Sequence, residues 1–406
     1  MSNKQKKNVP ELRFPGFEGE WEEKKLGEVG TFTSGGTPLK SKSEYWNGDI
    51  PWITTGDIHN IKRENITNFI TEKGLNESSA KLITNEAILI AMYGQGKTRG
   101  MSAILNFEAT TNQACAIYQT NQNINFVFQY FQKLYEFLRS LSNEGSQKNL
   151  SLSLLKEITL NYPNEQEQKK IGDFFSKLDR QIELEEQKLE LLQQQKKGYM
   201  QKIFSQELRF KDENGNDYPD WEEKQLGELS QIVRGASPRP IKDPKWFNKE
   251  SDIGWLRISD VTNQNGKIYH LEQKLSIEGQ EKTRVLVTTH LLLSIAASIG
   301  KPVMNFVKTG VHDGFLIFLN PKFNLFFMYY WLEYFKDKWS KYGQPGSQVN
   351  LNTEIVKSQT LNMPSNHEQE KVGQFFNRNE KLIELQQEKI MYLKRRKQVL
   401  LQKMFI

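Results

Sequence analysis

The sequence predicts an α+β protein with an internal pseudo-two-fold repeat, in which two domains of mixed helices and strands are joined by two long antiparallel coiled-coil helices. Three observations predict this architecture. The chain nearly repeats itself after about 200 residues. Each copy ends in a long proline-free stretch with heptad spacing of apolar residues. The middles of the two copies contain short apolar runs typical of strands.

Short strings frame each copy of the repeat. Gly-Ser-Gln-Lys-Asn-Leu at 145–150 returns as Gly-Ser-Gln-Val-Asn-Leu at 346–351, and Trp-Glu-Glu-Lys-x-Leu-Gly-Glu occupies both 21–28 and 221–228. Between these strings the copies diverge, which favours one scaffold built twice to present two different surfaces. The expected parts are a first domain at 1–150, a first spacer helix at 151–206, a second domain at 207–350 and a second spacer helix at 351–406.

The composition is that of a globular protein. A chain of 406 residues is long for one domain, and 37% hydrophobic with 26% charged residues is typical of a chain with a real core. No apolar run reaches membrane-spanning length and no signal-peptide pattern occurs, so we expect a cytoplasmic protein without a membrane partner. Cys115 is the only cysteine, which excludes an internal disulfide and a cysteine-based zinc site. The net charge of +6 permits a polyanionic partner without requiring one.

The end of each copy predicts one long helix with a heptad stripe of apolar residues. The stripe of the first helix consists of Ile171, Phe175, Leu178, Ile182, Leu189, Leu192, Tyr199 and Ile203. That of the second consists of Val372, Phe376, Ile383, Ile390, Leu393, Leu400 and Met404. Polar residues interrupt both stripes, namely Glu185 and Lys196 in the first and Asn379, Gln386 and Lys397 in the second. We therefore expect the helices to bury each other, with the flanking domains inverted at opposite ends. A pair of unrelated surface helices is the alternative.

The unlike middles, residues 11–145 and 207–345, predict mixed α+β domains. Strands are expected at Ile50–Thr54, Ala87–Met92, Ala114–Tyr118, Trp255–Ile258, Leu291–Ile295 and Phe315–Leu319. An aromatic helix is expected late in each domain, at Phe126–Leu141 and Phe323–Trp339. Because their aromatic residues recur at helical spacing, we interpret these helices as core rather than as platforms for stacked bases.

Polar, glycine-rich loops lie at corresponding places in both copies, at 33–40 and 93–99 in the first and at 234–242 and 297–301 in the second. Arg and Lys can neutralise phosphates or bind guanine, Gln can bind adenine, and glycine lets a backbone approach closely. A single loop of this kind is equally typical of a solvated turn, but recurrence in both copies favours DNA contact. The predicted DNA-contact residues are Ser34, Gly35, Gly36, Thr37, Lys40, Tyr93, Gln95, Lys97, Arg99, Arg234, Ser237, Arg239, Lys242, Ser298 and Lys301.

Three catalytic patterns are incomplete. Residues 91–98 resemble a phosphate-binding loop, but a strand-like Ser102–Leu105 follows where such a loop opens a helix. Residues 219–224 hold the acids and lysine of a metal-dependent nuclease, yet crowd them into one segment, which favours a structural repeat element. No Pro-Pro pair exists for an adenine methyltransferase motif. The nearest strings, at 161–163 and 362–364, are interpreted as turns before the long helices. Glu167 and Glu370 are then expected in the first helical turns, where their charge suits the helix dipole.

Together these features closely resemble the DNA-specificity subunit of type I restriction–modification systems. The matching strings are the repeated Trp-Glu-Glu-Lys-x-Leu-Gly-Glu, and Trp-Ile-Thr-Thr-Gly-Asp-Ile at 52–58 with Trp-Leu-Arg-Ile-Ser-Asp-Val at 255–261. Thr-Asn-Gln-Ala at 111–114 and Val-His-Asp-Gly-Phe at 311–315 are similar to family forms. So are Gly-Ser-Gln-x-Asn-Leu and Glu-Gln-x-Lys-(Ile/Val)-Gly before the long helices. The resemblance covers essentially the whole chain.

The resemblance implies a subunit with no catalytic activity and no cofactor of its own. Two methylation subunits would bind it and methylate adenine N6 with S-adenosylmethionine, and restriction subunits would use ATP and Mg²⁺ to translocate and cut unmethylated DNA. Each target-recognition domain would read one half of a split site in double-stranded DNA through the major groove. Because 11–145 and 207–345 differ, the site should not be a palindrome.

Two other classes of function stay open on the residues alone. A coiled-coil scaffold protein would bind DNA weakly and without sequence preference, even beside a methylation subunit. An enzyme, either a nucleotide hydrolase or a nuclease, is disfavoured by the incomplete motifs. The base sequence of the target does not follow from the loops, because no code links such loops to bases.

Overall fold

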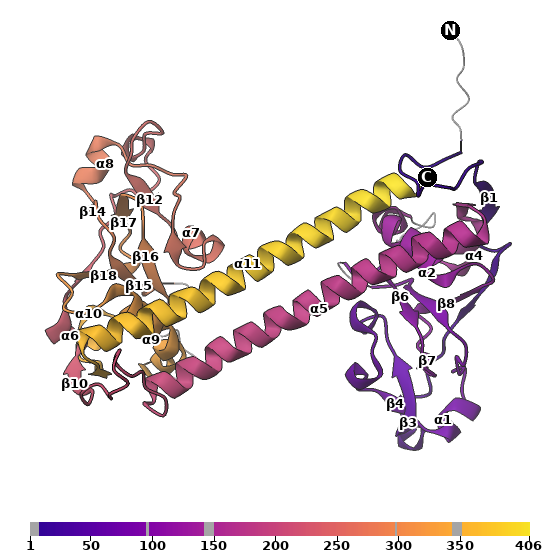
Figure 1. Ribbon diagram of the computed structural model, residues 1–406, viewed down its shortest axis with the longest axis horizontal. Coiled ribbons are helices and arrows are strands. Elements are labelled where there is room, and N and C mark those ends of the chain that lie inside the picture. The colour runs from indigo at the N-terminus through magenta and orange to yellow at the C-terminus, as the bar shows by residue number, and fades with distance from the viewer. Residues whose placement is uncertain (1–7, 95–96, 142–149, 297–298, 343–350) are drawn as a thin grey trace, which may run out of the picture. The chain divides into compact units, whose positions relative to one another are not determined.

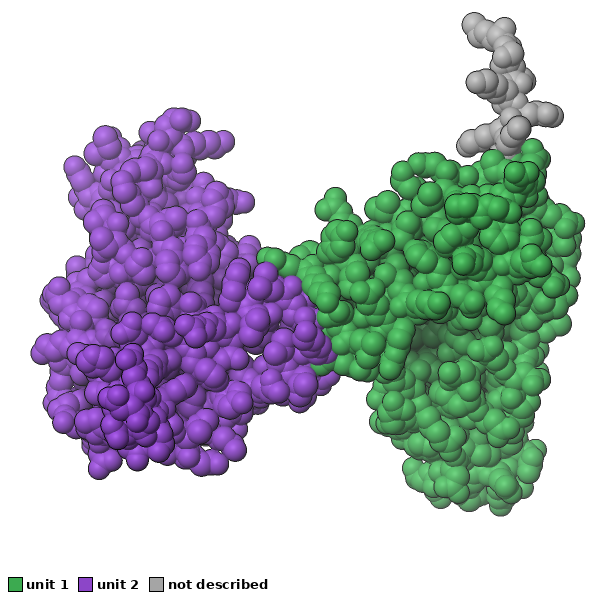
Figure 2. Space-filling model, viewed as in Figure 1, with its two compact units in different colours: residues 1–187, 388–406 green, residues 188–387 purple. Residues whose placement is uncertain are grey.

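The computed structural model describes residues 8–94, 97–141, 150–296, 299–342 and 351–406. The chain forms two compact units, coloured separately in Figure 2: unit 1 comprises residues 1–187 and 388–406, and unit 2 comprises residues 188–387. Each unit therefore contains part of both long helices, α5 (Glu165–Phe204) and α11 (Asn366–Met404), which Figure 1 labels. The units divide the chain differently from the predicted bounds at 150, 206 and 350, which stay a prediction.

A four-stranded antiparallel sheet forms the centre of unit 1. Its strand β5 reads Ala-Ile-Leu-Ile-Ala with all five residues buried. Because successive side chains point to opposite faces, Ile88 and Ile90 join one core cluster while Leu89 joins another. The sheet order is β2–β8–β5–β6 (Gly30–Ser34, Cys115–Thr120, Ala87–Ala91 and Ser102–Leu105). A second sheet has the order β4–β3–β7 (Phe69–Ile70, Trp46–Ile53 and Thr110–Thr111).

Short helices complete unit 1. The side chain of Asn123 caps α2 by accepting the Phe126 N–H at 3.0 Å, which fixes where this aromatic helix begins. Its rings at Phe126, Tyr130 and Phe131 are buried, which confirms their interpretation as core. The helices before α5 are α1 (Glu72–Asn76), α2 (Ile124–Lys133), α3 (Tyr135–Ser140) and α4 (Leu152–Glu157). The 3-10 turns are Ser43–Tyr45, Ile58–Asn60 and Arg63–Asn65.

Unit 2 repeats this plan with a larger main sheet. Alternate residues of β18 again divide between two core clusters, with Leu316 and Phe318 in one and Phe315 and Ile317 in the other. The main sheet order is β11–β18–β15–β16–β13 (Gln231–Arg234, Phe315–Leu319, Leu291–Ser294, Pro302–Asn305 and Lys267–Ile268). The smaller sheet order is β12–β17–β14 (Gly254–Leu256, Thr309–Val311 and Arg284–Leu286).

Some helices of unit 2 match those of unit 1. Asn324 caps α9 by accepting the Phe327 N–H at 3.0 Å, as Asn123 caps α2. Before α11 the helices are α6 (Leu226–Leu229), α7 (Ile258–Asn263), α8 (Ile277–Glu281), α9 (Leu325–Phe335) and α10 (Thr353–Lys357). The 3-10 segments are Pro244–Trp246 and Lys336–Tyr342.

The repeated Trp-Glu-Glu-Lys strings form strands that attach each domain to its long helix. Strand β1 (Glu22–Lys25) pairs antiparallel with β9 (Thr159–Tyr162) directly before α5. Strand β10 (Glu222–Gln225) pairs in the same way with β19 (Thr360–Met363) directly before α11. The prediction of an α+β fold with an internal repeat and a long helix ending each copy is confirmed.

Several predicted local elements are wrong. The strings at 161–163 and 362–364 are the ends of strands rather than turns, because their backbones pair with β1 and β10. The strand expected at Trp255–Ile258 ends at Leu256, and α7 begins at Ile258. The helix expected at Phe126–Leu141 is broken at Leu134, which ends α2 and precedes α3.

The prediction of a first-turn acid is confirmed for Glu167 and wrong for Glu370, because the acid in the first turn of α11 is Glu368. The counterpart of Glu167 is Glu368, not the exposed Glu370. Glu167 and Glu368 are both buried, and each carboxylate binds an arginine from the start of its domain: Arg13 at 2.6 Å and Arg209 at 2.8 Å. These acids therefore fix the domain start to the long helix, in addition to any interaction with the helix dipole.

Each unit contains side chains from both long helices. In unit 1 the carboxylates Glu185 and Asp179 of α5 bind Lys389 and Lys397 of α11 at 2.5 and 2.6 Å, an antiparallel order of contacts. In unit 2, Lys196 of α5 binds Glu380 of α11 at 3.4 Å. The predicted stripe residues are buried or half-buried except Tyr199. Pairing of the helices along their whole length, as a coiled coil, stays a prediction.

Candidate nucleic-acid interface

The predicted loops 33–40 and 234–242 share one backbone frame. The N–H of Gly35 donates to the Cys115 carbonyl, and the N–H of Gly36 donates to the Thr111 carbonyl at 2.8 Å. In unit 2 the N–H groups of Gly235 and Ala236 donate to the matching carbonyls of Phe315 and Val311, at 2.9 and 3.0 Å. Each loop is thus held at the same edge of its domain, directly after the first strand of the main sheet.

The glycines of these loops are used for packing inside the protein. A Cβ added to Gly35 would lie 2.1 Å from Thr111 Oγ1, and one added to Gly36 would lie 2.2 Å from the Ser79 backbone. Gly235 is enclosed in the same way by the His312 carbonyl oxygen, at 2.2 Å. The predicted DNA contact of Gly35 and Gly36 is untested, and their burial supplies a structural reason for glycine without it.

A hydroxyl fixes each loop to the segment before β8 or β18. In unit 1 the Thr37 hydroxyl donates to the side-chain carbonyl of Gln113. In unit 2 the Ser237 hydroxyl donates to the Asp313 carboxylate at 2.8 Å. The two loops are therefore held by the same kind of hydrogen bond, but the acceptor is an amide in unit 1 and a carboxylate in unit 2.

Asp313 organises the cations of the second loop. Its carboxylate binds the exposed Arg239 guanidinium at 2.6 Å, and its carbonyl accepts from Arg234 Nε at 2.6 Å. Burial by itself raises the pKa of the Asp313 carboxyl, but the Ser237 hydrogen bond, the neighbouring histidine in its protonated form and the two arginines outweigh it and lower this pKa below its ordinary value. Asp313 is therefore ionised at neutral pH and holds both arginines at the surface.

His312 is neutral in this setting. Burial lowers the pKa of its imidazole. Its Nδ1 accepts the Gly314 N–H at 2.8 Å, so the 3.2 Å approach of the same nitrogen to Asp313 is not an ion pair. The ring proton consequently sits on Nε2.

The other predicted residues of these loops are polar and accessible. Lys40 and Lys242 are exposed, and Ser34 and Thr37 are half-buried. Within the part of the chain that the structure describes, neither lysine has a side-chain partner. Both are therefore available to a phosphate.

The loop at 93–99 contains both exposed and half-buried side chains. Tyr93 and Lys97 are exposed. Arg99 is half-buried, and its guanidinium donates to the Arg139 carbonyl at the end of α3. This contact gives Arg99 a role in capping a helix C-terminus. The strand β6 follows this loop, so the resemblance to a phosphate-binding loop ends there, as the sequence predicted.

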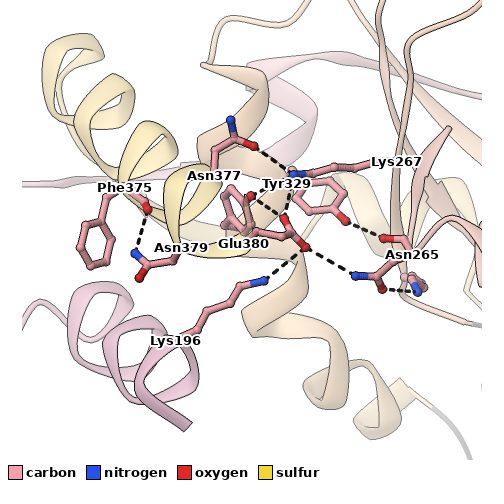
Figure 3. Close-up of polar contacts among 10 residues, drawn as sticks. Lys196, Asn265, Lys267, Tyr329, Phe375, Asn377, Asn379 and Glu380 are labelled. Atoms are coloured by element: carbon pink, nitrogen blue, oxygen red, sulfur yellow. Dashed lines mark hydrogen bonds and ion pairs between the residues drawn. The ribbon is translucent and has the colours of Figure 1, made fainter. Parts of the chain in front are cut away.

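Lys301 is half-buried and held by a neighbouring side chain of unit 2. Its ammonium donates to the Asn265 side chain at 3.1 Å, and burial lowers its pKa. As Figure 3 shows, Asn265 in turn reaches Glu380, which also binds Lys267 at 2.7 Å and Lys196 at 3.4 Å. Lys301 is thus adjacent to a buried charge network that joins the domain to both long helices. The predicted contacts of Gln95 and Ser298 lie outside the described residues.

Sequence reasoning missed several polar groups of the same surface. Four of them lie next to the loop at 234–242: Arg257, Gln273, His312 and Asp313. The sequence repeat could have identified three of these residues. His312 and Asp313 lie in Val-His-Asp-Gly-Phe and Arg257 lies in Trp-Leu-Arg-Ile-Ser-Asp-Val, and both strings match strings of the first copy at about the repeat distance. Gln273 stands in a segment without such a match.

The catalytic alternatives gain no support. Among the residues that the structure places, no group of three or more His, Cys, Asp or Glu could hold a metal ion. Asp220 lies fully exposed, and the acids at 222–223 belong to the strand β10. In the same residues, no helix combines the length and apolar character needed to cross a membrane.

Comparison with known families finds a match in both copies. The family model described as the type I restriction modification DNA specificity domain matches residues 18–194 and again residues 218–395.

Curated relatives are specificity subunits. The chain is 29% identical over 233 residues to the type I restriction enzyme MjaIX specificity subunit of Methanocaldococcus jannaschii, covering 54% of this chain and 53% of the relative. It is 33% identical over 168 residues to the EcoR124I/EcoR124II specificity subunit of Escherichia coli, covering 40% and 42%. These two matches span about half of each relative's length or less. The MjaVIII specificity subunit of M. jannaschii is 22% identical, with 93% of this chain and 90% of the relative covered.

Solved structures share the fold over nearly the whole chain. The crystal structure of a type-I restriction-modification system S subunit from M. genitalium is 15% identical, covers 98% of this chain and 99% of its own, and gives a TM-score of 0.61. A chain from a study of complex assembly and conformational transition of the type I R-M system is 17% identical, covers 97% and 98%, and gives 0.59.

Proposed function

This chain belongs to the type I restriction-modification DNA specificity family, and from that premise we propose that it reads a bipartite, non-palindromic target in double-stranded DNA. The unit 1 domain reads one half of the site and the unit 2 domain reads the other. The chain itself performs no chemistry in this proposal. It directs adenine N6 methylation and ATP-dependent restriction by partner subunits.

One observation carries the proposal: two matched loop frames bear unlike side chains. The frames share their backbone contacts, a hydrogen bond donated by a hydroxyl (Thr37 or Ser237) and a buried glycine. The groups they present differ, with Ser34 and Leu39 in unit 1 where Arg234 and Arg239 stand in unit 2. A scaffold protein has no need for identical frames with different surface groups. A reader of two different half-sites needs this arrangement.

The spacer helices offer a surface for the methylation subunits. Leu184 and Leu191 lie one heptad apart on α5 and are 49% and 53% exposed. Leu385 and Tyr392 occupy the matching positions of α11 and are 48% and 65% exposed. Large apolar side chains at heptad spacing on a helix are the pattern with which one helix binds another. We assign this second stripe to the two methylation subunits, and the buried stripe to the pairing of α5 with α11 as an antiparallel coiled coil.

The cofactors belong to the partners in this proposal. S-adenosylmethionine would be bound by the methylation subunits, and ATP with Mg²⁺ by the restriction subunits.

Binding measurements test the role of the loops. The chain, assembled with its methylation subunit, is titrated with target and scrambled DNA over a range of salt concentrations. We expect Arg239→Ala to cost about 1–3 kcal/mol on the target if the guanidinium reads a base. If it contacts phosphate, the slope of affinity against salt should fall by about one charge.

Lys322→Ala is the matched control, because this exposed lysine of unit 2 has no side-chain partner among the described residues and lies at the other end of the main sheet. It should leave affinity and salt slope unchanged. Unchanged affinity and salt slope for the Lys40, Lys97, Arg239 and Lys242 variants would remove these loops from the interface. Equal affinity of the wild-type complex for target and scrambled DNA would favour the scaffold alternative.

A further inference from the structure

A cleft opens beside the second loop of unit 2. It has a volume of about 620 Å³, within the range of sites that bind ligands. Its walls are largely apolar and include Phe247 and Trp255. The polar side chains that line it are Lys242, Arg257, Gln273 and His312.

Three of these polar side chains could bind a partner: Arg257 and His312 are held in place, and Gln273 is unpaired within the described residues. The Arg257 guanidinium is fixed by Asp260 at 2.9 Å and approaches Glu272 at 3.5 Å. The His312 ring packs edge-on against Trp255, with centroids 5.6 Å apart. Because His312 Nδ1 accepts from Gly314, its Nε2–H remains a donor. The Gln273 side-chain amide has no hydrogen-bond partner within the described residues.

The corresponding positions of unit 1 make the same hydrogen bonds to the backbone but carry different side chains. The Asp57 carboxylate accepts the Thr54 N–H at 2.8 Å, as the Asp260 carboxylate accepts the Arg257 N–H at 2.9 Å. Asn112 Oδ1 accepts the Ala114 N–H at 3.1 Å, just as the histidine nitrogen accepts the Gly314 N–H. Threonine thus stands where unit 2 has arginine, and asparagine stands where unit 2 has histidine.

We propose that Arg257, Gln273 and His312 read base pairs in the half-site of the unit 2 domain. This inference rests on the proposed function and assigns specificity to residues outside the predicted loops. An arginine fork matches guanine O6 and N7, and a glutamine amide matches adenine N6 and N7. The histidine Nε2–H can donate to the acceptors that guanine and thymine present in the major groove.

Charge argues for bases rather than phosphates as their partners. Gln273 and His312 are neutral, so neither releases counterions from DNA. The charge of Arg257 is offset by Asp260 and Glu272, whose carboxylates would repel a phosphate at the same place. Lys242, which forms no ion pair within the described residues, is the member of the cleft suited to a phosphate.

The test uses the complete chain assembled with its methylation subunit. Gln273→Ala removes an unpartnered amide, and His312→Asn installs the unit 1 residue, whose oxygen can keep the Gly314 contact. Affinity is measured for the target and for every single base-pair substitution in both half-sites. Each variant should bind the target about tenfold to a hundredfold less tightly and lose discrimination at one or two base pairs of one half-site. Discrimination in the other half-site and the salt slope should not change.

Gln231→Ala is the matched control, an exposed glutamine at the far end of β11 from the loop, and it should leave discrimination intact. Thermal unfolding checks that each variant keeps its fold. The inference is overturned if both variants keep full discrimination, or if they lower affinity equally for all sequences. In either case, specific binding by the wild-type complex would still support the proposed function. A wild-type complex without any preferred sequence would overturn the proposed function itself.

Discussion

Glu380 of α11 is a buried carboxylate on which the polar groups of unit 2 converge. It is 5% exposed and accepts a hydrogen bond from Tyr330 at 2.6 Å. Lys267, 6% exposed, binds it at 2.7 Å and also donates to Asn377 at 3.0 Å (Figure 3). Removing one member of such a buried pair leaves the other charge without a partner. The network therefore joins the unit 2 domain to α11. This holds whether or not the Lys267–Glu380 pair lowers the free energy of folding.

Glu380→Gln should destabilise unit 2 by roughly 3–5 kcal/mol at neutral pH, because Lys267 would stay buried without a counter-charge. Amide hydrogen exchange in β15 and β18 measures this loss. Glu388→Gln on the same helix is the control, since that side chain is exposed and the change should stay within about 0.5 kcal/mol. Equal protection of these strands in both variants would show that the network is not needed for stability.

The same carboxylate predicts a pH dependence. Burial by itself raises the pKa of Glu380, but Lys196, Lys267 and the Tyr330 hydrogen bond outweigh it, so the pKa falls below the ordinary 4.5. A carboxylate with a lowered pKa in the folded state contributes stability that is present above its unfolded value and is lost as the pH falls through the folded value. The difference in protection between wild type and Glu380→Gln should therefore shrink below about pH 4.5. A constant difference down to pH 3 would contradict the assignment.

At the scale of single residues, the sequence indicated which residues line the loops better than it indicated which groups they contact. Glycine, hydroxyl and basic residues recur in both copies, and this recurrence singled out the loops at 33–40 and 234–242 as candidates, whose contacts with DNA stay a prediction. What each side chain touches was not predictable, since Arg99 binds a carbonyl from α3 and Lys301 binds Asn265 across long sequence separations. Such contacts depend on tertiary packing, which local pattern does not encode.

At the scale of elements, the last residues of each long helix complete the core of a domain. Phe405, directly after α11, packs against Trp21, Phe126 and Tyr130 in unit 1, with ring centroids 6.4, 5.2 and 4.6 Å away. Phe204 at the end of α5 packs in the matching place of unit 2, against Phe327 and Phe376, both at 5.8 Å. The ends of both long helices are therefore part of the domain cores.

Phe405→Ala should cost unit 1 about 3–5 kcal/mol, because a buried ring leaves a cavity among other aromatic side chains. Hydrogen exchange in β5 and β8 follows unit 1, and exchange in β15 and β18 follows unit 2. We expect loss of protection in unit 1 alone. Ile406→Ala is the neighbouring control, since Ile406 is 37% exposed. Comparable protection in the two variants would mean that the helix end is not part of the core.

Long elements were the most predictable and short polar strands the least. The heptad pattern and the absence of proline predicted α5 and α11. Strands β1 and β10 read Glu-Glu-Lys-Lys and Glu-Glu-Lys-Gln, without apolar alternation. Their strand conformation comes from pairing with β9 and β19, so no local signal identified them. The break at Leu134 between α2 and α3 was likewise invisible in the aromatic spacing.

At the scale of the whole molecule, the proposal makes the long helices a ruler. Forty residues of α5 at 1.5 Å per residue give a rod of about 60 Å. If the rods separate the two reading domains, the unread gap between half-sites follows their length. Nothing in the sequence of the loops predicts the bases themselves, because a side chain such as Gln273 carries no code without its position against the DNA.

An insertion tests the ruler. Four residues added near 193–196 lengthen α5 by about 6 Å and turn it about 40° beyond a full circle, a tolerable stutter in a heptad stripe. The gap should grow by about one to two base pairs, provided that the ends of α11 adjust. Two added residues turn the helix by about 200° and should abolish assembly. An active complex with four added residues and an unchanged gap would exclude the helices as the ruler.

The most direct test of the central claim is a domain exchange read out by mapping methylated adenines in cells that express the chain with its methylation subunit. Residues 11–145 are replaced by the equivalent domain of a relative, while 207–345 and both long helices are kept. Because the frames attach each domain in the same way, the account predicts a new sequence in one half-site, with the other half-site and the gap unchanged. A change in both half-sites, or in neither, would contradict the claim that the two domains read independently.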